Sequence, residues 1–310
     1  MADLHTTIAG VRLPNPVMPA SGTYEYTDEH EQFFSPAELG AVVNKTIFPA
    51  ARPGNPPPRM FETPCGMLNA IGIPSKGLEF FIRDTLPRMK SYGVPVIVSV
   101  AGETTEEFVE ISRRVEETGN VDIIELNLSC PNLSHGREWA QDESLLQEVI
   151  EAVGSEVRLP LAAKLSPAVT DIVKMARLAE RSGASVISMI NTYKGVVIDV
   201  ESRKPVLGNV TGGLSGPAIL PLAVHAVYSV YEAVSIPIIG MGGIAGPRDA
   251  LQHICAGASA VAVGMYNFVD PMIMKKIVSG LDDYLDDPGI GSLEEIIGSA
   301  HGSGEHSAPR

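Results

Sequence analysis

Short apolar segments alternate with amphipathic segments along most of this 310-residue chain. The apolar segments are rich in Val and Ile and apolar on both faces, which is typical of strands buried in a parallel sheet. We expect strands at residues 17–20, 41–45, 95–100, 122–127, 161–165, 185–190, 237–240 and 260–264. Helical patterns lie between them, and helices are expected at 104–118, 171–182, 217–233 and 247–256. This alternation predicts an α/β fold, a single (β/α)8 TIM barrel.

Several segments fall outside the strand–helix repeat. Residues 6–16 are expected to form a hairpin that turns at Ala9 and Gly10 and closes the bottom of the barrel. Residues 51–73, with three consecutive prolines, are interpreted as a long stiff loop after the second strand. Another long loop follows the fourth strand, and residues 192–216 form an insertion after the sixth, with a small hairpin around 198–207. Loops of this length are usually functional, so we expect them to border an active site.

We expect one domain over residues 1–300 and a small, polar, disordered tail over 301–310. The net charge of −14, from 23 basic and 37 acidic residues, argues against a nucleic-acid partner, which requires a basic face. No apolar run reaches the ~18 to 20 residues of a membrane span, and the first residues do not resemble a signal peptide. We therefore expect no membrane partner.

The three cysteines are widely spaced and form no CxxC pair. They cannot build a zinc ribbon or an iron–sulfur cluster from this chain alone, and no metal site is expected. An odd number of cysteines fits a reducing compartment, which favours a cytoplasmic protein.

Polar side chains follow the apolar strand at 122–127 without a break. Asn127, Ser129, Cys130 and Asn132 succeed one another, and Pro131 stops the strand. In a barrel the carboxyl ends of the strands hold the ligand, so these groups are expected there. Cys130 is either a general base or a core residue. Its polar neighbours favour the base, since they make burial in apolar packing improbable.

Amides recur at the expected strand ends and loops, at Asn44, Asn69, Asn127, Asn132 and Asn191. Asn is often only a turn former. Several amides at one barrel mouth would instead suit a ring with alternating N–H and C=O groups, such as a pyrimidine, because amides both donate and accept.

Two lysines end apolar strands, Lys45 after the second and Lys164 after the fifth. Each either extends to water or meets an anion. The second reading predicts one lysine for a substrate carboxylate and one for an anionic cofactor.

Glycines follow the last two strands, at 240, 242 and 243 and at 264. In a barrel this position favours a phosphate site built from backbone N–H groups. The rival reading is a dinucleotide fingerprint, but the spacing is wrong and no acidic residue follows at the required distance.

With these motifs in place, the chain resembles the dihydroorotate dehydrogenases, specifically the NAD-linked B type of class 1. The resemblance runs from about residue 11 to 298. Besides the glycine sites, it rests on the segments at 19–23 (PASGT), 44–46 (NKT), 54–59 (GNPPPR), 67–72 (MLNAIG), 127–132 (NLSCPN), 164–167 (KLSP), 190–192 (INT) and 208–217 (GNVTGGLSGP). Two positions depart from the family pattern. Ser99 stands where Asn is typical, and Met265 stands where a smaller polar residue is frequent.

The resemblance implies one FMN per chain and oxidation of dihydroorotate to orotate in pyrimidine biosynthesis. Cys130 would remove the C5 proton while hydride passes from C6 to flavin N5. The implied FMN contacts are Ser21, Lys45, Thr46, Ser99, Asn127, Lys164, Ile190, Gly216, Gly242, Gly243, Gly264 and Met265. The implied substrate contacts are Lys45, Asn69, Ala70, Ile71, Gly72, Ile73, Asn127, Asn132, Asn191 and Thr192.

The resemblance also implies a homodimeric core in a heterotetramer, whose second subunit carries FAD and a [2Fe–2S] cluster and passes electrons to NAD. The absence of a dinucleotide fingerprint and of cluster cysteines in this chain agrees with that arrangement. Three alternatives stay open: the fumarate-using A type, another pyrimidine-reducing flavin barrel of the dihydrouracil or dihydrouridine kind, and a non-catalytic barrel that binds a phosphate ligand.

Overall fold

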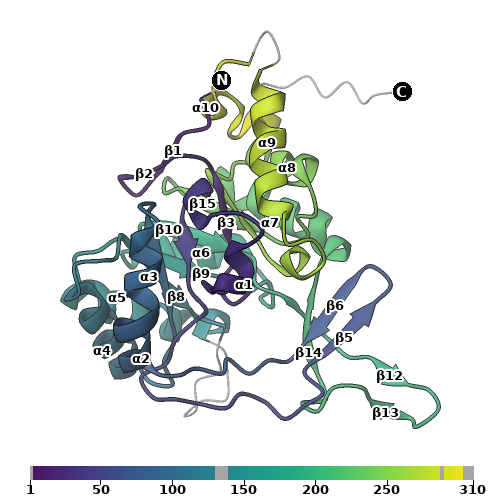
Figure 1. The fold of residues 1–310 in the computed structure, drawn as a ribbon. Helices are drawn as coiled ribbons and strands as arrows, with labels where there is room; N and C mark the ends of the chain where they lie inside the picture. Colours follow the sequence, from purple (N-terminus) through teal and green to yellow (C-terminus); the bar gives the residue numbers. More distant parts are fainter. Residues whose placement is uncertain (1–2, 130–138, 287–289, 303–310) are drawn as a thin grey trace.

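Eight parallel strands form the centre of the molecule, with helices packed around them (Figure 1). The structure, a computed structural model, describes residues 3–129, 139–286 and 290–302. Neighbouring strands follow the chain in order, and Gly40 N donates a 2.8 Å hydrogen bond to Val17 O between the first strand and the start of the second. The predicted barrel is therefore confirmed. Its strands are β3 (Val17–Pro19), β4 (Val42–Val43), β7 (Val96–Val100), β8 (Ile123–Asn127), β9 (Leu161–Lys164), β10 (Val186–Met189), β15 (Ile238–Met241) and β16 (Ala260–Val263).

The helices lie between the strands in sequence and bury one face each. A polar residue caps several of them: Thr104 accepts a hydrogen bond from Glu107 N, and Asp171 accepts one from Lys174 N. The main helices are α2 (Leu78–Phe80) continuing through a π-turn (Phe81–Thr85) into α3 (Leu86–Ser91), α4 (Thr105–Glu116), α5 (Glu143–Glu156), α6 (Ile172–Arg181), α7 (Leu220–Tyr231), α8 (Pro247–Cys255) and α9 (Ile273–Leu285). Short helices are α1 (Asp28–Glu31) and α10 (Leu293–Ile296).

The N-terminal hairpin closes one end of the barrel, as predicted. Strands β1 (Thr6–Ile8) and β2 (Val11–Leu13) pair antiparallel, and Ala9 and Gly10 make the turn with positive φ. Ile8 and Leu13 are fully buried against the apolar ends of the barrel strands. The opposite end is therefore the one left for a ligand.

The prediction of a plain loop over residues 51–73 was wrong. Strands β5 (Met60–Thr63) and β6 (Gly66–Asn69) form a hairpin there. Strands β11 (Tyr193–Gly195) and β14 (Gly212–Ser215) of the later insertion join it, and Gly213 pairs with Asn69. The resulting four-stranded sheet lies beside the barrel mouth (Figure 1). Local sequence could not reveal it because its central pairing joins segments far apart in the chain.

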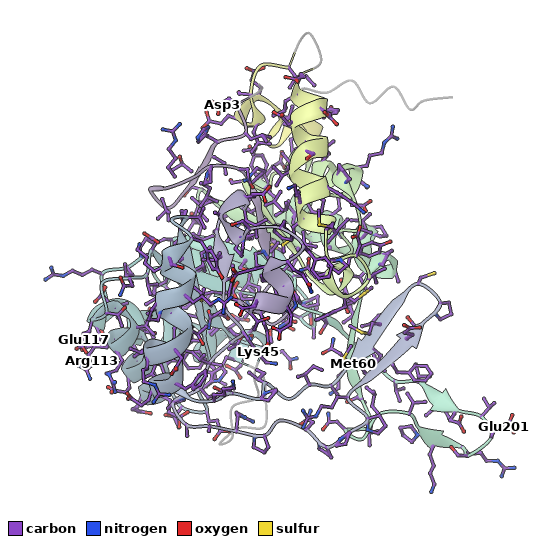
Figure 2. All side chains as sticks on the ribbon, viewed as in Figure 1. Asp3, Lys45, Met60, Arg113, Glu117 and Glu201 are labelled. Carbon is purple, nitrogen blue, oxygen red and sulfur yellow. The ribbon has the colours of Figure 1, made fainter. Side chains whose placement is uncertain are left out.

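The small hairpin predicted around 198–207 is confirmed. Strands β12 (Ile198–Asp199) and β13 (Lys204–Pro205) pair antiparallel and extend away from the barrel, with Glu201 at the far end (Figure 2). At the C-terminal end, His301 packs against the rings of Tyr228 and Tyr231. The folded part thus includes His301, the first residue of the predicted tail, while 303–310 lie outside the described residues.

The barrel interior changes from apolar to polar toward the mouth. Inward residues alternate along each strand. Ile97, Ile123 and Val186 belong to the apolar floor, and Ser99, Glu125 and Ser188 lie two residues further along the same strands. All three polar residues are almost completely buried. A buried polar layer therefore separates the apolar floor from the mouth.

Candidate active site

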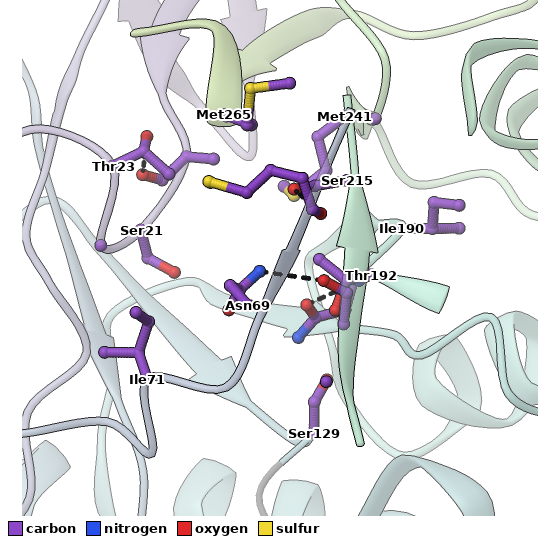
Figure 3. Close-up of a pocket in the computed structure, with 18 of the residues that line it drawn as sticks. Ser21, Thr23, Asn69, Ile71, Ser129, Ile190, Thr192, Ser215, Met241 and Met265 are labelled. Atoms are coloured by element: carbon purple, nitrogen blue, oxygen red, sulfur yellow. Dashed lines mark hydrogen bonds between the residues drawn. The ribbon is translucent and has the colours of Figure 1, made fainter. Parts of the chain in front are cut away.

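A cavity of about 770 Å³ opens at the carboxyl ends of the barrel strands and is bounded on one side by the four-stranded sheet (Figure 3). That volume suits a cofactor or a drug-sized ligand. Most of the residues implicated by the sequence line it: Ser21, Lys45, Thr46, Asn69, Ala70, Ile71, Gly72, Ile73, Asn127, Lys164, Ile190, Asn191, Thr192, Gly216, Gly242, Gly243, Gly264 and Met265. The candidate base Cys130 and the candidate contact Asn132 lie outside the described residues.

Glycine backbone forms one end of the cavity. Gly242 and Gly243 follow β15 with φ of 122° and 78°, a region that side chains rarely adopt. A Cβ on Gly243 would lie 2.5 Å from the backbone of Leu220, so no side chain fits there. Gly264 follows β16, and a Cβ on it would meet only Ala20, at 4.0 Å. The main chain here is open to a ligand, at the position where barrels commonly bind phosphate.

His253 of α8 supports this end of the cavity from behind. Its Nε2 donates a 3.0 Å hydrogen bond to Gly242 O, because a carbonyl can only accept. The ring is fully buried, and burial lowers its pKa from 6.5 to about 4. His253 is therefore a neutral donor near pH 7. Sequence reasoning missed it, since a lone His in a helix carries no motif.

Lys164 is held between two groups at the end of β9. Its Nζ donates a 2.9 Å hydrogen bond to Ser21 Oγ, and Glu125 Oε1 lies 3.7 Å from the same Nζ. The lysine and glutamate side chains are only 6% and 5% exposed. A buried ammonium needs such a counter-charge, so Lys164 does not extend to water. Glu125 had no role in the sequence reasoning, although it lies two residues before Asn127.

Asn127 belongs to a hydrogen-bond chain that crosses to the second strand. Its Nδ2 donates to Thr46 Oγ1 at 2.9 Å, and the Thr46 hydroxyl lies 2.9 Å from Ser99 Oγ. Asn44 Oδ1 accepts from Ser99 N at 2.6 Å. Asn44 therefore braces the strands. Ser99 is fully buried and does not belong to the cavity lining, so it supports Thr46 from behind instead of forming part of the wall.

Lys45 projects into the cavity without a fixed partner. In the described part of the chain, no hydrogen bond or ion pair to its Nζ is present, and the residue is half-buried. Burial lowers the pKa of Lys45, while nearby Glu25 opposes that shift. Figure 2 shows Lys45 near the centre of the molecule. An accessible cation at this depth is suited to an anionic group of a ligand.

The remaining amides come from both sides of the cavity, Asn69 from β6 of the four-stranded sheet and Asn191 from the end of barrel strand β10. Asn69 Nδ2 donates to Gly213 O at 3.1 Å and ties β6 to β14 (Figure 3). Asn191 Oδ1 accepts from Thr192 N at 2.8 Å. These bonds leave Asn69 Oδ1 available to accept a hydrogen bond from a ligand and Asn191 Nδ2 available to donate one.

Comparison with known proteins agrees with this geometry. The family model for dihydroorotate dehydrogenase matches residues 3–285. The chain belongs to the dihydroorotate dehydrogenase family.

Proteins similar to this chain are found in several bacteria. A protein of Desulforudis audaxviator is 47% identical over 298 residues, covering 96% of this chain and 97% of its own length. Proteins of Geobacillus kaustophilus and Bacteroides fragilis are 45% and 44% identical, covering 99% and 96% of this chain and 98% and 99% of their own lengths. All three are named dihydroorotate dehydrogenase B (NAD(+)), catalytic subunit.

Among the described residues, no helix combines the length and apolar character required to cross a membrane. No group of three or more His, Cys, Asp or Glu side chains within those ranges could hold a metal ion.

Proposed function

We propose that this chain is the catalytic subunit of an NAD-linked dihydroorotate dehydrogenase, which oxidises dihydroorotate to orotate in pyrimidine biosynthesis. The observation that carries the proposal is one cavity that combines a glycine-lined end, a buried lysine paired with Glu125, and Lys45, which has no partner among the described residues and lies beside amides. A phosphate, a redox ring and a carboxylated pyrimidine would find complementary groups there.

The cofactor would be FMN. Its phosphate would meet the backbone of Gly242, Gly243, Gly264 and Met265, a turn in which a Cβ on Gly243 would clash with Leu220. Lys164 would face the polar edge of the ring, and Ile190 and Gly216 would border its faces. When bound, FMN would supply the acceptor for the hydride that leaves C6 of the substrate.

The substrate carboxylate would pair with Lys45, which has no competing partner among the described residues. Asn69, Asn127, Asn191, Thr192 and Asn132 would hydrogen-bond the ring, together with the backbone of residues 70–73. Cys130 would accept the proton from C5. Closure of the cavity by the four-stranded sheet would exclude water and strengthen these polar contacts.

Electrons would leave through a second subunit that carries FAD and a [2Fe–2S] cluster, with two catalytic subunits at the centre of a heterotetramer. The name of the relatives, the catalytic subunit of an NAD-linked enzyme, supports a separate electron-transfer subunit and disfavours the fumarate-linked alternative.

The test is spectroscopic. Purified protein should be yellow, and dihydroorotate should bleach the flavin absorbance in the absence of oxygen. A colourless chain that cannot be reconstituted with FMN would refute the proposal. NAD reduction should require the co-purified complex, and rapid turnover of the isolated chain with fumarate would contradict the B-type assignment.

A further inference from the structure

Glu125 lies inside the barrel beneath the cavity, and the reaction described above gives it no task. It faces inward from β8 and is 3% exposed. Its Oε2 accepts a 2.8 Å hydrogen bond from Ser188 Oγ of β10. Its Oε1 lies 3.7 Å from Lys164 Nζ and has no hydrogen-bond donor within the described ranges. The carboxylate therefore lies between a hydroxyl that orients it and one cation.

We propose that Glu125 is a positioning residue that fixes the ammonium of Lys164 beside the flavin and offsets part of its charge, and that it thereby lowers the reduction potential of the flavin. The inference rests on the proposed function, because it requires FMN in the cavity.

The charges of Lys164 and Glu125 lie at different positions relative to the cavity. Lys164 lines the cavity and bonds to Ser21 at its lip, whereas Glu125 is absent from the lining and approaches from the floor. The lysine is thus held from two sides. A carboxylate behind it reduces the positive potential that the cavity experiences. In a buried site, charges at such distances interact far more strongly than in water.

The direction of the effect follows from the charge of the reduced flavin. A cation near the ring stabilises the negative charge gained on reduction and raises the potential. The negative charge of Glu125 opposes that effect. Replacing it by a neutral group of the same shape should therefore make FMN easier to reduce.

The primary test is the FMN midpoint potential of E125Q in the holoenzyme, measured by dye-coupled titration. We expect a shift to a more positive potential, with FMN still bound. E125D, which retains the charge, should stay closer to wild type. E143Q is the matched control, because Glu143 forms an exposed ion pair with Lys174 on the helical surface; its potential should equal that of wild type. An E125Q holoenzyme with wild-type potential would overturn the inference.

Stability provides a second test if E125Q folds poorly. Removing one member of a buried pair leaves an uncompensated charge, while removing both can be nearly neutral. E125Q/K164M should therefore unfold at a higher temperature than E125Q when both are measured without FMN, because Lys164 is itself a proposed FMN contact. A double variant no more stable than E125Q would show that the two residues do not act as a pair, and would refute the inference. Wild-type protein that takes up no FMN would refute the proposed function as well, which distinguishes the two failures.

Discussion

His253 Nε2 donates a hydrogen bond of 3.0 Å to the carbonyl oxygen of Gly242. The bond joins a fully buried ring on α8 to the turn after β15. Because the carbonyl of this peptide is held from behind, the turn keeps its open side toward the cavity. Burial lowers the pKa of His253 to about 4 and so keeps the ring neutral near pH 7.

The first prediction concerns the pH dependence of stability. Burial lowers the pKa of His253 from 6.5 to about 4, so between these values the unfolded chain binds more protons than the folded one. The free energy of unfolding therefore has its full value with respect to His253 above pH 6.5 and declines as the pH falls toward 4. The total corresponds to up to about 3 kcal/mol of unfolding free energy. Urea denaturation between pH 4.5 and 8 should show the decline.

His253→Gln should flatten that pH dependence, because it removes the titrating group. His225→Gln is the control, since His225 is exposed on α7 and should leave the slope unchanged. Identical slopes for wild type and His253→Gln would contradict the prediction.

The second prediction is that Gly243→Ala impairs both folding and FMN binding. A side chain at φ 78° is strained, and its Cβ would lie 2.5 Å from the Leu220 backbone. We expect a loss of about 1–3 kcal/mol in stability and at least about tenfold weaker FMN binding. Gly246→Ala is the matched control, because a Cβ there meets no atom within 4 Å. Fluorescence titration with FMN should distinguish the two variants, and equal affinities would argue against a phosphate at this turn.

The third prediction concerns Lys45. Lys45→Met should weaken orotate binding by about 10- to 100-fold, the usual loss for a hydrogen bond to a charged group. Difference spectra of the flavin on orotate addition provide the measurement. Lys194→Met should have little effect, because Lys194 is exposed at the cavity rim. Unchanged affinity in Lys45→Met would indicate a pyrimidine substrate without a carboxylate.

The fourth prediction concerns Cys130. Cys130→Ser should slow flavin reduction by dihydroorotate at least about 100-fold near neutral pH, because a serine hydroxyl is a much weaker acid than a thiol. Stopped-flow absorbance in anaerobic single turnovers measures the step. Cys65→Ser is the control, since Cys65 is exposed and does not belong to the cavity lining. A wild-type rate in Cys130→Ser would remove Cys130 from the proposed mechanism.

Local pattern was sufficient for the barrel and for most of the cavity lining. The strands of a parallel sheet are buried on both faces, so each is a short apolar run that can be read without its neighbours. Their carboxyl ends share one mouth, so polar residues directly after them, such as Lys45, Asn127 and Lys164, could be placed together from order alone. The N-terminal hairpin and the hairpin after the sixth strand could also be predicted, because each pairs residues that are close in sequence.

Contacts between distant segments were decided only by the tertiary structure. The sheet that covers the mouth depends on the pairing of Gly213 with Asn69, which neither segment reveals by itself. Thr46 lies between the Ser99 hydroxyl and the cavity, so Ser99 does not reach the cavity wall. Glu125 and His253 do not line the cavity; each contacts a residue that does, Glu125 through Lys164 and His253 through Gly242. Sequence order specifies which side chains reach the barrel mouth, but the charges and hydrogen bonds that hold them depend on which strands and helices become neighbours in space.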